Sequence, residues 1–203
     1  MASLLNVGRA LVTPPPYDAE IEYLESTGTQ YIDTGVSISY DLRVVVKVNI
    51  RAIAARNTSH FFGGRAVSTG GAGYGITTAN GALSSDYFGS RVQIYSICPT
   101  NRWLNIDKNK NVVIVDDTTI TNTASTTTIP ERNVYLFGFD APQYNGSYSG
   151  TIRYSQAKIY KNDNLILDFI PVRVGQVGYM YDKVSGQLFG NSGTGDFILG
   201  PDK

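Results

Sequence analysis

The chain is poor in the residues that build disulfides, zinc sites and nucleophilic centres. Its 203 residues include one cysteine, Cys98, and one histidine, His60. A single cysteine forms no disulfide within the chain, which is unlike a disulfide-stapled secreted module. A zinc site or a Cys–His nucleophile has almost no side chains to draw on. We therefore expect Cys98 to be a buried small apolar residue, and His60 to be a strand residue that packs locally.

The chain also lacks an excess of charge and a long apolar run. Lys plus Arg and Asp plus Glu both total 17, so the chain has no net positive charge that would attract nucleic acid. No stretch approaches the roughly 18 consecutive apolar residues of a membrane helix, so no membrane insertion is expected. Residues 1–9 carry no basic leader, and Arg9 interrupts the short apolar stretch. The sequence thus predicts that the chain has no cleavable signal peptide and that it is made in the host cytoplasm.

The sequence is rich in strand and turn signals. Leu42, Val44, Val46, Val48 and Ile50 recur with a period of two, and polar residues dominate the positions between them. This alternation is typical of an antiparallel strand with one buried face, and Val45, the apolar exception, suggests contact with a second layer. No segment has a sustained helical period. The sequence predicts an all-β sandwich over residues 20–203, with further strands at 60–64, 73–77, 91–97, 102–107, 112–116, 133–139, 151–160, 164–171, 178–181 and 196–199.

Asn-rich segments and a threonine tract mark the predicted connections. Residues 107–111 and 161–164 each link two apolar runs, and Asn tolerates the left-handed backbone of tight hairpins. In residues 182–186, Gly186 can take a positive φ while the Asp182 carboxylate accepts backbone N–H groups. The tract Thr118–Thr128 holds seven threonines and is interpreted as an edge strand or a loop.

Two motifs at the ends of the chain resemble a known family. The first is the segment 23–35, YLESTGTQYIDTG; the second combines DFIPV at 168–172, GYMYDKVSG at 178–186 and FGN at 189–191. They are similar to the concanavalin A-like, laminin-G-like jelly-roll modules of bacteriophage structural proteins and gut-bacterial surface proteins. The resemblance runs from about Ala19 to Phe197 and implies a jelly roll of two antiparallel sheets. The motif aromatics would be core and corner residues: Tyr31, Phe169, Tyr179, Tyr181 and Phe189.

The resemblance implies a non-enzymatic structural protein of a bacteriophage virion. The module would act as a head decoration, a head fibre or a tail-associated part, displayed on the particle surface. Its expected partners are other virion proteins and further copies of itself in a homo-oligomer. Proteins with this sandwich fold have many different functions, so two alternatives stay open. The first is a carbohydrate-binding adhesion module for host polysaccharide, and the more distant one is a glycoside hydrolase.

Residues 1–19 differ from the rest and are predicted to form an extended arm with a proline-rich spacer. Its aliphatic side chains lack a strand or helix period, and three prolines impose an extended backbone. One interpretation is an assembly arm that packs on a neighbouring subunit; the other is a frayed terminus. The arm residues are Leu4, Leu5, Val7, Leu11, Val12, Pro14, Pro15 and Pro16.

A polar-aromatic loop is the candidate glycan site. It contains Asp140, Gln143, Tyr144, Asn145 and Tyr148, whose rings can stack on sugars and whose amides and carboxylate can bind hydroxyls. The same residue types suit a protein–protein interface or a turn with packed tyrosines.

Catalytic and metal-binding patterns are weak. Glu20 and Glu25 resemble the acidic pair of laminarinase-type hydrolases, but the string opens the domain and Trp103 is the single tryptophan available for sugar stacking. Loop oxygens of Asp116, Asp117, Asp140 with Asn145, and Asp163 leave Ca²⁺ open, although no spacing defines a calcium loop. No cofactor is therefore expected. Gly63 and the Gly70–Gly75 segment lie between predicted strands and do not open a helix, so close backbone approach explains their glycines better than a phosphate loop.

Overall fold

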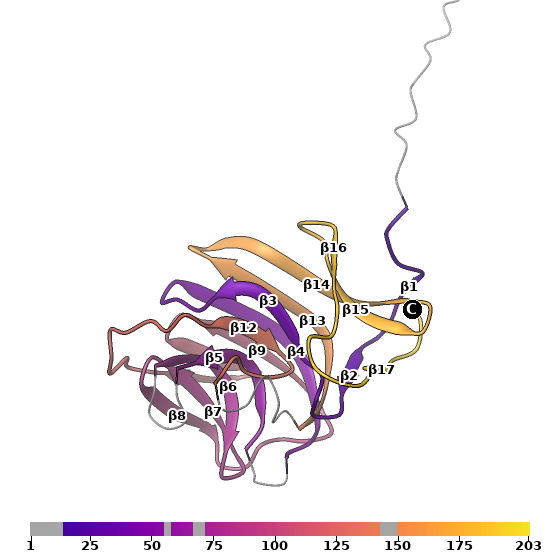
Figure 1. Cartoon of the computed structure of the whole chain (residues 1–203). Coiled ribbons are helices and arrows are strands. Elements are labelled where there is room, and N and C mark those ends of the chain that lie inside the picture. Colours follow the sequence, from indigo (N-terminus) through magenta and orange to yellow (C-terminus); the bar gives the residue numbers. More distant parts are fainter. Residues whose placement is uncertain (1–13, 55–57, 67–71, 143–149) are drawn as a thin grey trace, which may run out of the picture.

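The protein folds as a sandwich of two antiparallel sheets (Figure 1). The computed structural model describes residues 14–54, 58–66, 72–142 and 150–203. No helix occurs in these ranges, so none there is long and apolar enough to span a membrane. The expected all-β sandwich is confirmed.

The larger sheet contains eleven described strands, and β4 and β13 lie at its centre. β1 (Ala19–Glu20) pairs with β14, while β2 (Leu24–Ser26) pairs with both β13 and β17 (Ile198–Leu199). The main path is, in order, β11 (Thr118–Thr121), β10 (Val112–Val115), β9 (Trp103–Asn109), β4 (Leu42–Ala52), β13 (Thr151–Lys161), β14 (Asn164–Val174), β15 (Val177–Asp182) and β16 (Gln187–Phe189).

The smaller sheet covers the inner face of the larger one. Its edge strands approach the edges of the larger sheet, β8 beside β11 and β3 beside β16. The sandwich is therefore nearly closed at both sides. The path of the smaller sheet is β3 (Ile32–Ser37), β12 (Asn133–Leu136), β5 (His60–Arg65), β6 (Gly73–Ala79), β7 (Ala82–Tyr87) and β8 (Ser90–Tyr95).

The core lies between the two sheets, and the inner face of β4 follows the predicted alternation. The five apolar residues from Leu42 to Ile50 at period two are all buried. Two buried tyrosines tie the sheets together. The Tyr154 hydroxyl on β13 donates to the Phe61 carbonyl of β5 at 2.7 Å, and the Tyr74 hydroxyl on β6 donates to the Lys108 carbonyl of β9 at 2.6 Å. The sheets are thus held in one relative position by polar contacts as well as by apolar packing.

The two terminal motifs meet in space. The Gln30 amide donates to the Asp196 carbonyl at 3.1 Å, and its Oε1 accepts from the Thr27 N–H at 2.8 Å. The Tyr31 N–H donates to Asn191 Oδ1 at 3.2 Å. In Figure 1 the chain end lies beside β1, where the Lys203 N–H donates to the Glu20 carbonyl at 3.0 Å. These contacts join the first motif and the start of the domain to the C-terminal part of the chain.

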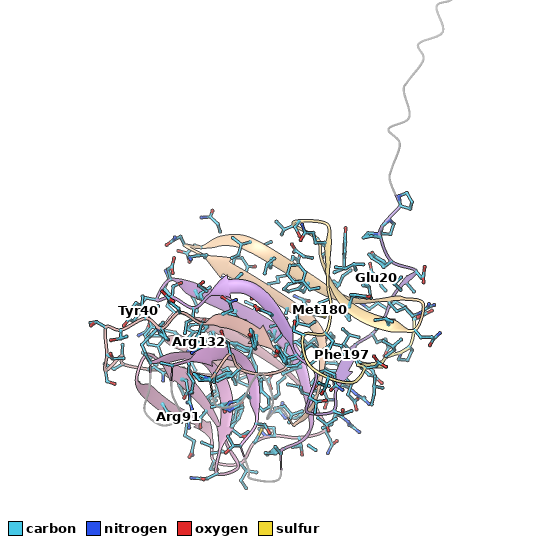
Figure 2. All side chains as sticks on the ribbon, viewed as in Figure 1. Glu20, Tyr40, Arg91, Arg132, Met180 and Phe197 are labelled. Carbon is cyan, nitrogen blue, oxygen red and sulfur yellow. The ribbon has the colours of Figure 1, made fainter. Side chains whose placement is uncertain are left out.

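The motif aromatics divide between the core and the outer face. Phe169 is fully buried and packs edge-on against the partly buried Phe189, with ring centroids 4.9 Å apart. On β15 the inward residue is Met180, which is fully buried and is labelled in Figure 2, so Tyr179 and Tyr181 point outward and are only half-buried. Of the predicted core and corner residues, Phe169 therefore lies in the core, whereas strand alternation places Tyr179 and Tyr181 on the outer face.

The turn after β15 has the predicted chemistry. The Asp182 carboxylate accepts the N–H groups of Asp168, Val184 and Ser185 at 2.7, 3.1 and 2.8 Å. Burial alone would raise the pKa of Asp182, but these hydrogen bonds outweigh burial and hold the pKa below its usual value. Gly186 has a φ of +74°, as expected.

Other strand predictions needed correction. β7 was not predicted, since its Ser84, Ser85 and Asp86 look like loop residues, yet all six strand residues are buried. β12 ends at Leu136 because Phe137 has a φ of +64°, which breaks the extended backbone. The predicted turn at 107–111 is shorter than expected, since β9 continues to Asn109 and Lys110 takes the left-handed conformation. The turn at 161–164 is confirmed by positive φ values at Asn162 and Asp163.

Contact with the sandwich begins inside the predicted arm. Tyr17 packs edge-on against Tyr181 at 5.0 Å, and the Asp18 N–H donates to the Arg173 carbonyl at 2.9 Å. Residues 14–16 are exposed. The aliphatic arm residues, Leu4, Leu5, Val7, Leu11 and Val12, lie outside the described residues, and their role stays a prediction.

Candidate functional site

A hollow of about 160 Å³ opens on the outer face of the larger sheet. Strand alternation explains its position: β4 points Val44, Val46 and Val48 into the core and therefore turns Val45 and Lys47 outward. The side chains facing this hollow come from β4, β9, β10 and β13 and from the turn after β10. Its lining residues are Val45, Val46, Lys47, Asn105, Ile106, Asp107, Ile114, Asp116 and Gln156.

A second hollow of about 430 Å³ shares Asp107 and Ile114 with the first. It lies toward the β9–β10 hairpin, so the two hollows are neighbours on the outer face of the sheet. We call the two hollows together the sheet groove. The second hollow adds Arg43, Asn109, Lys110, Asn111 and Val112 to the lining.

Aromatic rings flank the sheet groove at opposite ends. The Lys47 ammonium lies 5.9 Å from the centroid of Trp103, and the Arg43 guanidinium lies 5.2 Å from the centroid of Tyr160. Trp103 begins β9, whereas Tyr160 pairs with Arg43, which in turn pairs with Asn109 at the end of β9. The six residue steps from Trp103 to Asn109 span about 20 Å, so the two rings lie at opposite ends of the groove. Both rings are half-buried, so part of each remains exposed.

The carboxylates of the sheet groove are held by arginines. Asp107 accepts two hydrogen bonds from Arg43, at 2.9 and 2.6 Å. Asp116 accepts from Arg102 at 2.6 Å and from the Asn105 N–H at 3.0 Å. Burial alone would raise the pKa of Asp116, but the bonds from Asn105 and Arg102 outweigh burial and lower it. These carboxylates are fixed in place and largely neutralised.

The sheet groove combines an apolar floor with polar walls. Val45 is half-buried and Ile114 is 40% exposed, so both offer aliphatic surface to a ligand. Asn105 and Gln156 supply amide donors and acceptors, and Lys47 supplies an ammonium group. Such a surface can pack against the C–H face of a sugar ring and bind its hydroxyl groups. No covalent chemistry is needed for this role.

The predicted glycan loop is represented by one described residue. The Asp140 carboxylate accepts from the Asn133 N–H at 2.8 Å and from Arg132 at 3.4 Å, and its backbone bonds to β5. Asp140 therefore stabilises the smaller sheet and is not part of the sheet groove. The other predicted loop residues, Gln143, Tyr144, Asn145 and Tyr148, lie outside the described residues.

The two glutamates of the hydrolase alternative belong to different strands. Glu20, labelled in Figure 2, is on β1 and lies 3.7 Å from the Lys203 ammonium. Glu25 is on β2, is buried, and forms an ion pair with Arg153. Each carboxylate thus has its own cation, and neither lines the sheet groove.

Two of the expected calcium ligands, Asp116 and Asp163, and the single histidine have local partners. Asp116 pairs with Arg102, and Asp163 lies 3.4 Å from the Lys110 ammonium. His60 is buried, stacks on Phe139 at 4.4 Å, and shares a 2.9 Å hydrogen bond with Thr77, which confirms its local packing. In the described part of the chain, no three His, Cys, Asp or Glu residues gather as metal ligands. Cys98 is buried, as expected.

The sheet groove was not predicted from the sequence. Its polar strand residues come from β4, β9 and β13, which are far apart in the chain. The available signal was the polar face of β4, which marks Lys47 as outward. Val45 was interpreted as a contact with a second layer, but it lines the hollow instead.

Comparison with solved structures shows a likeness of fold. No family model matches the chain, and no curated protein matches it. The solved structure of a Bacteroides ovatus protein, described as a "putative carbohydrate binding protein", has a TM-score of 0.55 and 12% sequence identity over 89% of this chain. The likeness is one of fold. The match covers 60% of the other chain.

Proposed function

We propose that this protein is a carbohydrate-binding module whose ligand lies in the sheet groove. The observation that carries this proposal is the pair of neighbouring hollows across β13, β4, β9 and β10, with aliphatic floor residues, amide walls and an aromatic ring at each end. Ligand sites are typically concave and largely apolar, with a few polar groups that fix orientation. The fold likeness to the Bacteroides ovatus protein supports the same function.

The sheet groove favours the carbohydrate-binding alternative over a purely structural role in a virion. The described residues supply no observation specific to a virion component, whereas they supply a surface suited to sugars. A carbohydrate-binding module could act on a particle or on a cell surface, so the predicted virion location stays a prediction. The proposed role is binding without catalysis.

The direct test is a glycan array probed with the full chain, followed by titration calorimetry on the best ligand. Asn105→Ala and Gln156→Ala each remove a side-chain amide from the groove wall without touching the core. A lost hydrogen bond contributes about 0.5–1.5 kcal/mol, so each change should weaken binding by about 2- to 12-fold.

Gln93→Ala is the matched control, because Gln93 is an exposed amide on β8 of the smaller sheet. This variant should bind as tightly as the unmodified protein. Binding that survives both groove changes, or that is lost in the Gln93 variant, would place the ligand elsewhere. No binding to any glycan would refute the proposed function.

A further inference from the structure

Two lysines stand diagonally across the first hollow of the sheet groove. Lys47 on β4 pairs with Gln156 on β13, and Val45 on β4 pairs with Lys158 on β13. Diagonal neighbours on one face of an antiparallel pair lie about 7–8 Å apart, within reach of long side chains. The Lys47 ammonium lies toward Trp103 on β9 and the Lys158 ammonium toward Asp168 on β14, so the two positive charges flank Val45 and Gln156, which line the hollow.

These two lysines are poorly compensated by carboxylates. Among the described residues, no Asp or Glu lies within ion-pair distance of the exposed Lys47 ammonium. The Lys158 ammonium lies 3.8 Å from the Asp168 carboxylate, but the same oxygen is held more closely by Lys183, at 3.2 Å. One carboxylate thus serves two lysines, which leaves positive charge at this side of the groove.

The acidic residues of the groove do not offset that charge. Asp107 is held by Arg43 through two hydrogen bonds, and Asp116 is held by Arg102 and by the Asn105 N–H. The negative charge of each aspartate is thus balanced by its own arginine and is not available to neutralise the lysines. The local surplus at Lys47 and Lys158 therefore persists on a chain whose formal net charge is zero.

We propose that the sheet groove selects acidic glycans, with Lys47 and Lys158 binding anionic substituents of the glycan from opposite sides of the first hollow. Each substituent is a carboxylate or a sulfate ester, since both present oxygen acceptors to ammonium donors. Trp103, beside Lys47, would stack on the sugar that carries the charge or on its neighbour. This inference rests on the proposed function and names its ligand class.

The test compares three oligosaccharides of equal length with the full chain: a galacturonic acid oligomer, a sulfated galactose oligomer and a neutral galactose oligomer. At least one acidic oligomer should bind about tenfold or more tightly than the neutral one, a difference of about 1.4 kcal/mol. This preference should shrink as ionic strength rises, because exposed charges are screened. The acidic oligomer that binds more tightly identifies the substituent.

The double variant Lys47→Gln with Lys158→Gln should lose the preference for the acidic oligomer and retain neutral sugar binding. Lys161→Gln is the control, since it removes an exposed lysine at the hairpin end of the same strand and should keep the preference. Equal binding of acidic and neutral oligomers, or binding of a neutral glycan alone, would overturn the selectivity but leave the proposed function standing. An unchanged preference in the double variant would also overturn it. Absence of any glycan binding would refute both proposals.

Discussion

A buried lysine should make the stability of this protein rise with pH. Lys108 is fully buried on the inner face of β9, where its ammonium donates to Ser85 Oγ at 2.9 Å. The ammonium also lies 4.6 Å from the ring centroid of Tyr74 and 5.2 Å from that of Tyr87. Burial lowers the pKa of Lys108 from 10.5 to about 7, although the Asp86 carboxylate acts in the opposite direction.

The sign of the effect follows from the proton count. Between pH 7 and 10.5 the unfolded chain holds a proton on this lysine and the folded chain does not, so the free energy of unfolding rises with pH. Below pH 7 both states are protonated, and the full cost of burying the charge is present, about 5 kcal/mol from the gap between the two pKa values. From pH 7 to pH 9 the free energy of unfolding should increase by about 2 kcal/mol.

The measurement is urea unfolding at pH 7, 8 and 9 for the unmodified protein and for Lys108→Met. Burial raises the pKa of the Cys98 thiol to about 12, which lowers stability above pH 9, so the comparison stops there. Both proteins share that contribution, and their difference isolates Lys108. The Met variant should lack the rise and be more stable at pH 7. Parallel curves for the two proteins would show that the amine stays charged in the folded state. An NMR titration of the Lys108 side chain in the unmodified protein tests the same point if the variant does not fold.

Three further predictions concern packing, backbone geometry and the arm. Phe169→Ala should destabilise the fold by about 3–5 kcal/mol, because it leaves a cavity beside Phe189; a change below about 1 kcal/mol in urea unfolding would contradict the burial of this ring. Gly75→Ala should lower the free energy of unfolding by at least about 2 kcal/mol, because its Cβ would lie 2.1 Å from the Phe62 carbonyl oxygen. Gly81→Ala is the control: Gly81 also has a positive φ, but a Cβ there meets no atom within 4 Å, so this variant measures the cost of the backbone conformation alone. Deleting residues 1–13 should leave the melting temperature unchanged, since the contacts of Tyr17 with the sandwich remain, but should abolish incorporation into assemblies with full-length chain. A truncated chain that unfolds would place the arm in the core, and one that still assembles would rule out the anchor.

The sequence by itself determined the class of fold and much of its core. The period of two on β4 predicted which five residues face inward, because strand geometry alone sends alternate side chains to opposite faces. The terminal motifs predicted the buried Phe169 and the turn at Asp182, since both depend on local sequence. Close backbone approach at Gly63 and Gly75 was also correctly predicted: a Cβ on Gly63 would lie 2.0 Å from the Tyr74 carbonyl oxygen of the neighbouring strand.

The tertiary structure decided what the polar residues do. The sequence predicts a turn at Lys108 and gives no strand signal over β7, because burial of a lysine and of Ser85 depends on partners from the opposite sheet. The sheet groove depends on the register of β13, β4 and β9, which places Lys47 beside Gln156 and Asn105 although these residues are far apart in the chain. Register is set by long-range pairing and by a bulge in β13 between Tyr154 and Gln156, which local sequence does not specify. The candidate site is therefore a product of the folded sheet.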